Sequence, residues 1–178
     1  MKVFAYCAES YRQAARQAAG VEPVTCPPAS FASFDVAQLE GNDFLYFDLH
    51  GYPGSDRWFG DAGIAALTAQ QVGAANLEGS VVFATNCYLA DAASVMLDAL
   101  LSAGARYVIA GSGENYAWSK APGGASLMAL WVRRLMQVGI SPLAALRVAK
   151  VRVMYSRNDI KTIDDTLAFR AYERKGMA

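Results

Sequence analysis

Two residues with the chemistry of acyl transfer each follow an apolar stretch of this sequence. His50, the only histidine among 178 residues, follows the nearly apolar run 44–49. Cys87 lies two residues after the largely apolar run 81–85. A thiol is a modest nucleophile near neutral pH because its unperturbed pKa is about 8.5. A nearby imidazole can accept the thiol proton or stabilise the thiolate, and it can also protonate a departing amine. The pair predicts nucleophilic catalysis if the fold brings the two side chains together.

The glycine after His50 adds a second chemical feature. Gly51 has no side chain, so its backbone N–H can approach a substrate carbonyl closely. Together with the backbone N–H of Cys87 it is a candidate oxyanion hole, in which the loss of one donor typically costs about 10²–10³ in turnover.

The elements that must position these residues alternate along the chain. Apolar runs and helical segments succeed one another at a spacing typical of right-handed βαβ crossovers. We expect strands at 3–7, 21–26, 44–49, 81–85 and 107–110, and a weakly alternating edge strand at 166–173. We expect helices at 10–19, 68–75, 91–103, 125–138 and 142–155, and a weak helical stretch at 31–39. The predicted fold class is α/β: a three-layer α/β/α sandwich with a mostly parallel sheet, in one domain spanning 1–178.

This topology favours a shared site for His50 and Cys87. In open parallel sheets, ligands bind outside the carboxyl ends of the strands. His50 and Cys87 follow successive central strands, so we expect both at the same sheet edge. Either residue alone is more often structural, a hydrogen-bonded histidine or a small buried thiol. The pairing, followed by a glycine, favours function.

Composition excludes several other classes. Lys plus Arg equals Asp plus Glu at 16 each, so there is no basic field for a nucleic acid. The apolar runs are interrupted well before about 18 residues, which predicts no membrane span. Three cysteines without a CxxC pair indicate reduced thiols and a cytoplasmic protein, with Cys7 and Cys26 as buried thiols. A single histidine disfavours a metal site, and no GxGxxG or Walker pattern is present, so we expect no cofactor.

Three further residues are candidates for substrate binding. Asp48 lies two residues before His50, on the same face of the strand. A carboxylate inside an apolar run needs a partner. Asp48 therefore either orients the site or recognises a cationic group, or, as the commoner alternative, accepts structural hydrogen bonds from a loop. Ser112 and Glu114 lie in the polar loop after the strand 107–110, where a solvated carboxylate is the plainer interpretation of Glu114.

The order of these motifs resembles a known group of enzymes. His50-Gly51 after an apolar strand, then an apolar strand followed by Cys87, is similar to the clan CD cysteine peptidases: caspases, gingipains, clostripain, legumain, separase and the CHAT domains. Segments 67–71, 103–110 and 139–147 also look like CHAT sequences, so the resemblance covers roughly 43–155. The chain looks closest to CHAT domains and the gingipain–clostripain-like group. It departs from them at Thr85-Asn86, where the CHAT cysteine is commonly preceded by Ser-Ala.

The resemblance implies a caspase-like fold and specific roles. His50 would be the general acid that polarises the scissile carbonyl, and Cys87 the nucleophile that forms a thioester, without a required third member. The loop with Ser112 and Glu114 would line the primary specificity pocket together with residues 7–10, where Glu114 can select Lys or Arg. The implied partners are a peptide or protein substrate and a possible regulatory protein.

Two other functions are compatible with this sequence. A degenerate caspase-like scaffold that binds a partner protein is the non-enzymatic alternative, although the presence of both His50 and Cys87 argues against it. A class I amidotransferase-like hydrolase ranks lower. Such enzymes place the cysteine in a Gly-x-Cys-x-Gly turn with the histidine later in the chain, whereas here Asn86-Cys87-Tyr88 follows the histidine.

Overall fold

A six-stranded sheet forms the centre of the computed structural model, which describes residues 1–156 and 159–174. The strand order is β2-β1-β3-β6-β7-β8; all neighbouring pairs are parallel except β7 and β8, which are antiparallel. The strands of this sheet are β1 (Val3–Ala8), β2 (Val24–Cys26), β3 (Phe44–Asp48), β6 (Val81–Ala84), β7 (Tyr107–Ala110) and β8 (Arg170–Glu173).

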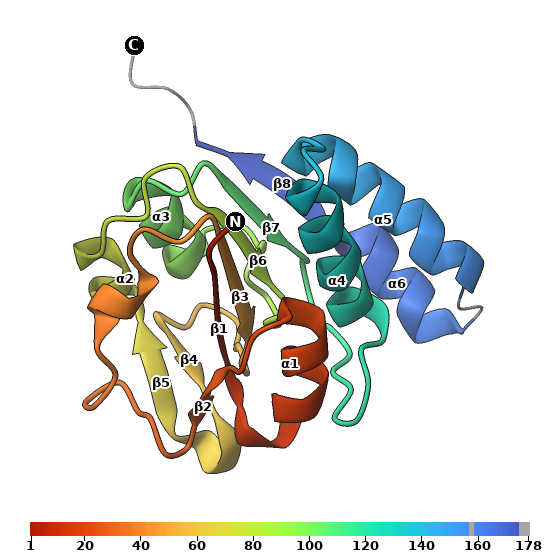
Figure 1. The fold of residues 1–178 in the computed structure, drawn as a ribbon. Coiled ribbons are helices and arrows are strands. Elements are labelled where there is room, and N and C mark those ends of the chain that lie inside the picture. The colour runs from red at the N-terminus through yellow and green to blue at the C-terminus, as the bar shows by residue number, and fades with distance from the viewer. Residues whose placement is uncertain (157–158, 175–178) are drawn as a thin grey trace.

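Helices cover both faces of this sheet. The α-helices are α1 (Arg12–Ala19), α2 (Ala69–Ala74), α3 (Val95–Ser102), α4 (Gly124–Gln137), α5 (Pro142–Ser156) and α6 (Ile160–Ala168). Short 3-10 turns are η1 (Glu9–Tyr11), η2 (Val36–Leu39) and η3 (Asp61–Gly63). Figure 1 shows α2 and α3 on one side of the sheet and α1, α4, α5 and α6 on the other. Two separate apolar cores lie on the two faces, which confirms the predicted three-layer α/β fold.

The two central strands that lead to the candidate residues are direct neighbours. β3 pairs in parallel with β6, with Leu45 opposite Val82 and Phe47 opposite Ala84. Every residue of both strands is buried, as expected for strands covered by helices on both faces. Both strands therefore end at the same edge of the sheet.

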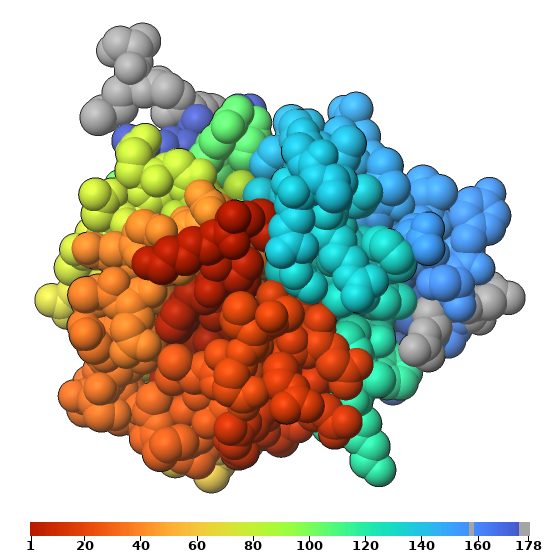
Figure 2. Space-filling view, in the orientation of Figure 1, coloured from red at the N-terminus to blue at the C-terminus, as the bar shows by residue number. Residues whose placement is uncertain are grey.

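The N-terminal segment, which lies outside the stretch 43–155 that resembles clan CD peptidases, is an integral part of the molecule. β1 pairs with β3, and α1 packs against α4. The buried Arg133 of α4 donates a hydrogen bond from Nε to the carbonyl oxygen of Ala18, at 2.9 Å. Figure 2 shows the surface of α1 lying directly against that of α4.

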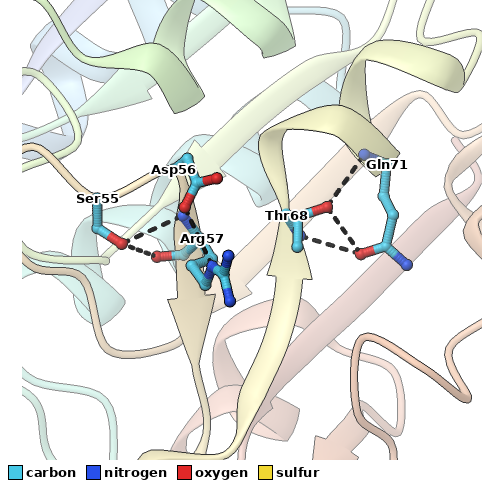
Figure 3. Close-up of polar contacts among 5 residues, drawn as sticks. All are labelled: Ser55, Asp56, Arg57, Thr68 and Gln71. Carbon is cyan, nitrogen blue, oxygen red and sulfur yellow. Dashed lines mark hydrogen bonds and ion pairs between the residues drawn. The ribbon is translucent and has the colours of Figure 1, made fainter.

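A small hairpin lies in the Gly-rich loop after β3, where the sequence indicated no strands. β4 (Arg57–Phe59) pairs in antiparallel fashion with β5 (Ala65–Thr68). Ser55 Oγ accepts from the backbone N–H of Arg57 and donates to its carbonyl oxygen, which closes the start of the hairpin (Figure 3). The strands are too short for a periodic signal and depend on these local bonds.

Some predicted boundaries were wrong for identifiable reasons. The second strand begins at Val24 instead of residue 21, because the preceding Pro23 has no N–H to donate to a neighbouring strand. The helix expected from 91 begins at Val95, where the Ser94 side chain caps it by accepting from the N–H of Leu97. Only η2 forms within 31–39, and α6 occupies part of the stretch expected as an edge strand.

No helix within the described ranges 1–156 and 159–174 combines the length and apolar character needed to cross a bilayer.

Thr68 is expected to contribute measurably to stability. It forms a capping box with Gln71 at the start of α2, in which each side chain bonds the other residue's backbone N–H (Figure 3). Thr68→Ala should lower the free energy of unfolding by about 1 kcal/mol in urea titrations. Thr68→Ser, which keeps the hydroxyl, is the control and should retain most of the stability that the cap contributes. Equal losses in the two variants would contradict the capping role.

Candidate active site

His50 is held by its backbone and leaves its ring accessible. It follows β3 and pairs with Phe59 of β4: its N–H donates to the Phe59 carbonyl at 2.7 Å, and its carbonyl accepts from the Phe59 N–H at 2.9 Å. The His50 side chain is 39% exposed. The Tyr11 ring lies edge-on to the imidazole, with centroids 5.4 Å apart, and Nε2 is 3.9 Å from Asp61 Oδ1.

Cys87 lies beyond the end of β6 and is partly exposed. Its Sγ accepts a hydrogen bond from the backbone N–H of Asn115 at 3.3 Å and lies 3.6 Å from the Asn115 carbonyl oxygen. Burial raises the pKa of the Cys87 thiol, the Asn115 N–H opposes that effect, and the charges of Glu114 and Asp165 raise the pKa further. The resting thiol is therefore protonated near neutral pH and needs a base to become a nucleophile.

Gly51 brings the two candidate residues together. A Cβ at this position would collide with the carbonyl oxygen of Cys87, so the backbone after His50 lies directly against the backbone of Cys87. The N–H of Gly51 donates no hydrogen bond to any residue that the structure describes. That leaves the Gly51 donor available, while the predicted oxyanion hole stays a prediction.

Asn86 and Asn115 fasten the strand ends around Cys87. The buried side chain of Asn86 accepts from the N–H of Leu49 at 3.3 Å, which ties the end of β6 to the end of β3. Asn115 Nδ2 donates to the Asn86 carbonyl at 2.9 Å, which ties the loop after β7 to the same strand ends. In the sequence, Asn86 stands out only as a departure from CHAT sequences, and nothing marks Asn115 as its partner.

Glu114 and Ser112 lie in the loop after β7 as expected, but only Glu114 acts on the cysteine. Glu114 accepts a hydrogen bond from the Tyr88 hydroxyl at 3.1 Å, and its charge raises the pKa of Cys87. Ser112 is exposed, and its hydroxyl makes no hydrogen bond within the part of the chain that the structure describes. A substrate contact for either residue stays a prediction.

The loop carrying Glu114 is fixed by a buried carboxylate that sequence reasoning missed. Asp165 of α6 accepts from the backbone N–H groups of Tyr116 and Ala125, each at 3.2 Å. Burial raises the pKa of Asp165 to about 6, against the effect of these two bonds. The missing Cβ of Gly124, at φ +49°, leaves the space that the Asp165 carboxylate occupies. No signal in the sequence pointed to this role, because no helix was expected at 160–168.

Asp48 is only 2% exposed, and its oxygens are engaged inside the protein. Oδ1 accepts from Thr85 Oγ1 at 2.7 Å, and Oδ2 accepts from the Tyr46 hydroxyl at 3.1 Å. This geometry fits the structural alternative, a hydrogen-bond acceptor that ties β3 to the loop after β6, better than direct contact with a substrate. Burial raises the pKa of Asp48 to about 6, while Thr85, Tyr46 and the charge of His50 lower it.

The other two cysteines do not compete with Cys87. Cys7 and Cys26 are fully buried, as the sequence predicted, and burial raises the pKa of both thiols. Across residues 1–156 and 159–174 no group of three or more His, Cys, Asp or Glu side chains is placed to hold a metal ion.

The space beside Cys87 is small. A cavity of about 20 Å³ lies next to it, bounded among others by Gly51, Trp58 and Met96. That is room for about one water molecule. A substrate would therefore lie along the open surface near His50 and Cys87, outside this cavity.

Comparisons with known proteins place this fold. No protein-family model matches the sequence, and no curated protein matches it. The structure of gingipain R, described as an Arg-specific cysteine proteinase, matches with a TM-score of 0.62 and 13% identity, over 97% of this chain and 46% of that one. The Saccharomyces cerevisiae separase–securin complex matches with a TM-score of 0.60 and 9% identity, over 97% of this chain and 12% of that one. The Porphyromonas gingivalis RgpB pro- and mature-domain complex gives 0.59 and 10%, over 97% and 47%.

These likenesses show the fold. The chain has the helix-covered, mostly parallel α/β fold of the caspase-like type seen in gingipain and separase. It spans less than half the length of those matched chains.

Glu114→Gln is expected to make the Cys87 thiol easier to ionise. Removing the negative charge removes one of the causes that raise the pKa of Cys87, so alkylation by iodoacetamide should begin at lower pH. Tyr88→Phe is the matched control, since it removes the hydrogen bond to Glu114 but keeps the carboxylate. An unchanged alkylation profile in Glu114→Gln would show that this charge does not act on the thiol.

Asp48→Asn is expected to change how stability depends on pH. With a folded pKa of about 6 and an unfolded one near 4, the folded carboxyl keeps a proton that the unfolded chain has released between these values. Raising the pH through this window therefore destabilises the wild-type fold, by on the order of 2 kcal/mol. Asp48→Asn should reduce the fall in the free energy of unfolding as the pH rises from 4 to 7. A smaller fall should remain, because the raised pKa of Asp165 acts in the same direction.

The measurement is urea unfolding at a series of pH values between 4 and 7. Asp56→Asn, at an exposed carboxylate on the hairpin, is the control and should leave the slope as it is. The same slope in wild type and Asp48→Asn would mean that Asp48 does not hold its proton in the fold.

Proposed function

We propose that this chain is a cysteine peptidase of clan CD, closest to the CHAT and gingipain–clostripain-like group, which cleaves peptide bonds with His50 and Cys87. The observation that carries the proposal is that the backbone directly after the only imidazole lies against the backbone of the only partly exposed thiol. Both follow neighbouring parallel strands at one sheet edge, with Gly51 against the Cys87 backbone. The caspase-like fold supports the same reading.

In the proposed reaction, His50 takes the proton of the Cys87 thiol, and the sulfur attacks the scissile carbonyl carbon. The developing oxyanion would be held by the N–H groups of Gly51 and Cys87. The C–N bond then breaks as the imidazolium returns its proton to the departing amine, leaving a thioester on Cys87. Water hydrolyses the thioester, which releases the carboxylic acid and restores the thiol. No cofactor takes part.

The charges near Cys87 bear on substrate choice. Glu114 lies in the loop that the resemblance assigns to the specificity pocket, and its charge opposes ionisation of the thiol. A Lys or Arg side chain of the substrate beside Glu114 would neutralise that charge and favour the thiolate. A cationic substrate would thus be preferred in binding and would also promote formation of the nucleophile.

A regulatory protein partner and a cytoplasmic location remain parts of this proposal. The complexes of separase with securin, and of the RgpB pro- and mature domains, are the precedents for a protein partner. The single-domain organisation over residues 1–178 is likewise proposed.

Cys87→Ala and His50→Ala should each abolish peptide cleavage while leaving the fold intact, because each removes one half of the dyad. The measurement is turnover of a peptide library by the purified protein, with circular dichroism as the check on folding. Asp56→Asn, at an exposed carboxylate just before β4, is the control and should keep both the fold and peptide cleavage. Retained cleavage by Cys87→Ala would reject the assignment.

Labelling separates the peptidase from an inactive scaffold. A peptidyl electrophile should modify Cys87 and spare Cys7 and Cys26, as read by mass spectrometry of digested protein. If Cys87 in the wild-type protein is not labelled and no peptide is cleaved, the partner-binding scaffold is the better account.

A further inference from the structure

One carboxylate, that of Asp61, lies near the His50 ring and has no part in the proposed reaction. Asp61 begins η3, shortly after β4, and its Oδ1 is 3.9 Å from His50 Nε2. We propose that Asp61 is a positioning residue for His50: it accepts the Nε2–H, fixes the tautomer of the ring and leaves Nδ1 to carry the catalytic proton. The inference rests on the proposed function, in which His50 transfers that proton.

The carboxylate of Asp61 is itself held firmly. Ser10 donates to both of its oxygens, from the backbone N–H to Oδ2 and from Oγ to Oδ1, each at 2.7 Å. Hydrogen bonds to a carboxylate are among the stronger kind. Ser10 lies in η1, directly after β1. Asp61 therefore links the end of β1 to His50, which follows the neighbouring strand β3. The distance to Nε2 is one that an unliganded site can shorten when substrate binds.

The turn that carries Asp61 adopts a costly conformation. Ala62, the next residue, has left-handed backbone angles of φ +54° and ψ +22°, which cost roughly 1–2 kcal/mol for a residue with a Cβ. On the other side of Asp61, a Cβ on Gly60 would collide with Cys26, so the turn is packed tightly against β2. Strain of this kind is typical of functional sites, where surrounding structure holds the backbone in place.

Of the groups around the imidazole, Asp61 is the one placed to orient the ring. Tyr11 of η1 faces the ring edge-on, and Asp48 acts on it from β3 through its charge. The Asp48 oxygens are engaged by Thr85 and Tyr46. Cys87 lies across the site after β6. Among the described residues, Asp61 is the carboxylate that lies within ion-pair distance of a His50 ring nitrogen.

The chemical consequence follows from the two ring nitrogens. With a proton fixed on Nε2 by Asp61, Nδ1 keeps a lone pair. Nδ1 can take the Cys87 proton and later give the same proton to the departing amine. Asp61 stabilises the imidazolium formed between these steps without accepting its proton, in the way a carboxylate orients a histidine base in other hydrolases.

Asp61→Asn tests this role with little change of shape. The Asn oxygen can accept from the Ser10 N–H, which turns the amide Nδ2 toward His50 Nε2. An N–H donor there should shift the ring toward the tautomer protonated on Nδ1. Because His50 is the only histidine, ¹⁵N NMR of the ring nitrogens reports it without ambiguity. We expect the Nε2–H form to dominate in wild type and the Nδ1–H form to grow in Asp61→Asn.

The same variant should lose turnover more than binding. We expect kcat to fall by up to about 100-fold with KM unchanged, which is the low end of what general acid–base catalysis contributes. Asp56→Asn, an exposed carboxylate on the same hairpin, is the matched control and should change neither the ring signals nor kcat (Figure 3). Ser10→Ala removes one bond to Asp61 and should give a smaller change of the same kind, which provides a second variant if Asp61→Asn folds poorly.

The two readouts separate this inference from the proposed function. Ring signals and kcat that are the same in wild type, Asp61→Asn and Ser10→Ala would overturn the inference even in an active peptidase. A tautomer shift in Asp61→Asn in a protein that cleaves no peptide would support the positioning role and reject the peptidase. A fall in kcat without a tautomer shift would also overturn the inference, because a structural effect alone would explain it.

Discussion

The close approach of two backbones, at Gly51 and at Cys87, is the constraint on which the site depends. It follows from the pairing of β3 with β6, which brings both strands to an end at one edge. Only glycine fits at position 51, because any side chain would strike the Cys87 carbonyl. The backbones of the proposed dyad are therefore brought together by the strand pairing and by Asn86. Such a site needs no strong direct bond between imidazole and thiol to keep its shape.

The electrostatics of the site follow from the carboxylates that surround it. Burial, Glu114 and Asp165 all raise the pKa of Cys87, while the backbone N–H of Asn115 and that of Cys87 itself oppose them. In the proposed reaction, formation of the thiolate therefore depends on His50 and on the charge of the substrate. Two carboxylates lie near His50: Asp48 at the end of β3, and Asp61 in η3, whose Oδ1 is 3.9 Å from His50 Nε2.

The sequence predicted what depends on long apolar runs. The strands 44–49 and 81–85 were found because burial on both faces leaves few polar residues, and their order placed His50 and Cys87 at one edge. Asn86, Asn115 and Asp61 could not be found in this way, since their partners are distant in sequence and are chosen by tertiary packing. β4 and β5 escaped for a different reason: they are three and four residues long, within a Gly-rich loop.

The missed helix α6 shows why such errors matter for function. The stretch 166–173 was expected as an edge strand, and only Arg170–Glu173 forms one. The preceding helix begins where Asp159 accepts from the N–H of Thr162, and this places Asp165 under the loop after β7. That loop carries Asn115, whose N–H donates to the Cys87 sulfur, and Glu114, whose charge raises the pKa of Cys87. The environment of Cys87 is therefore set in part by a carboxylate far along the chain, and a sequence motif centred on Cys87 alone cannot contain it.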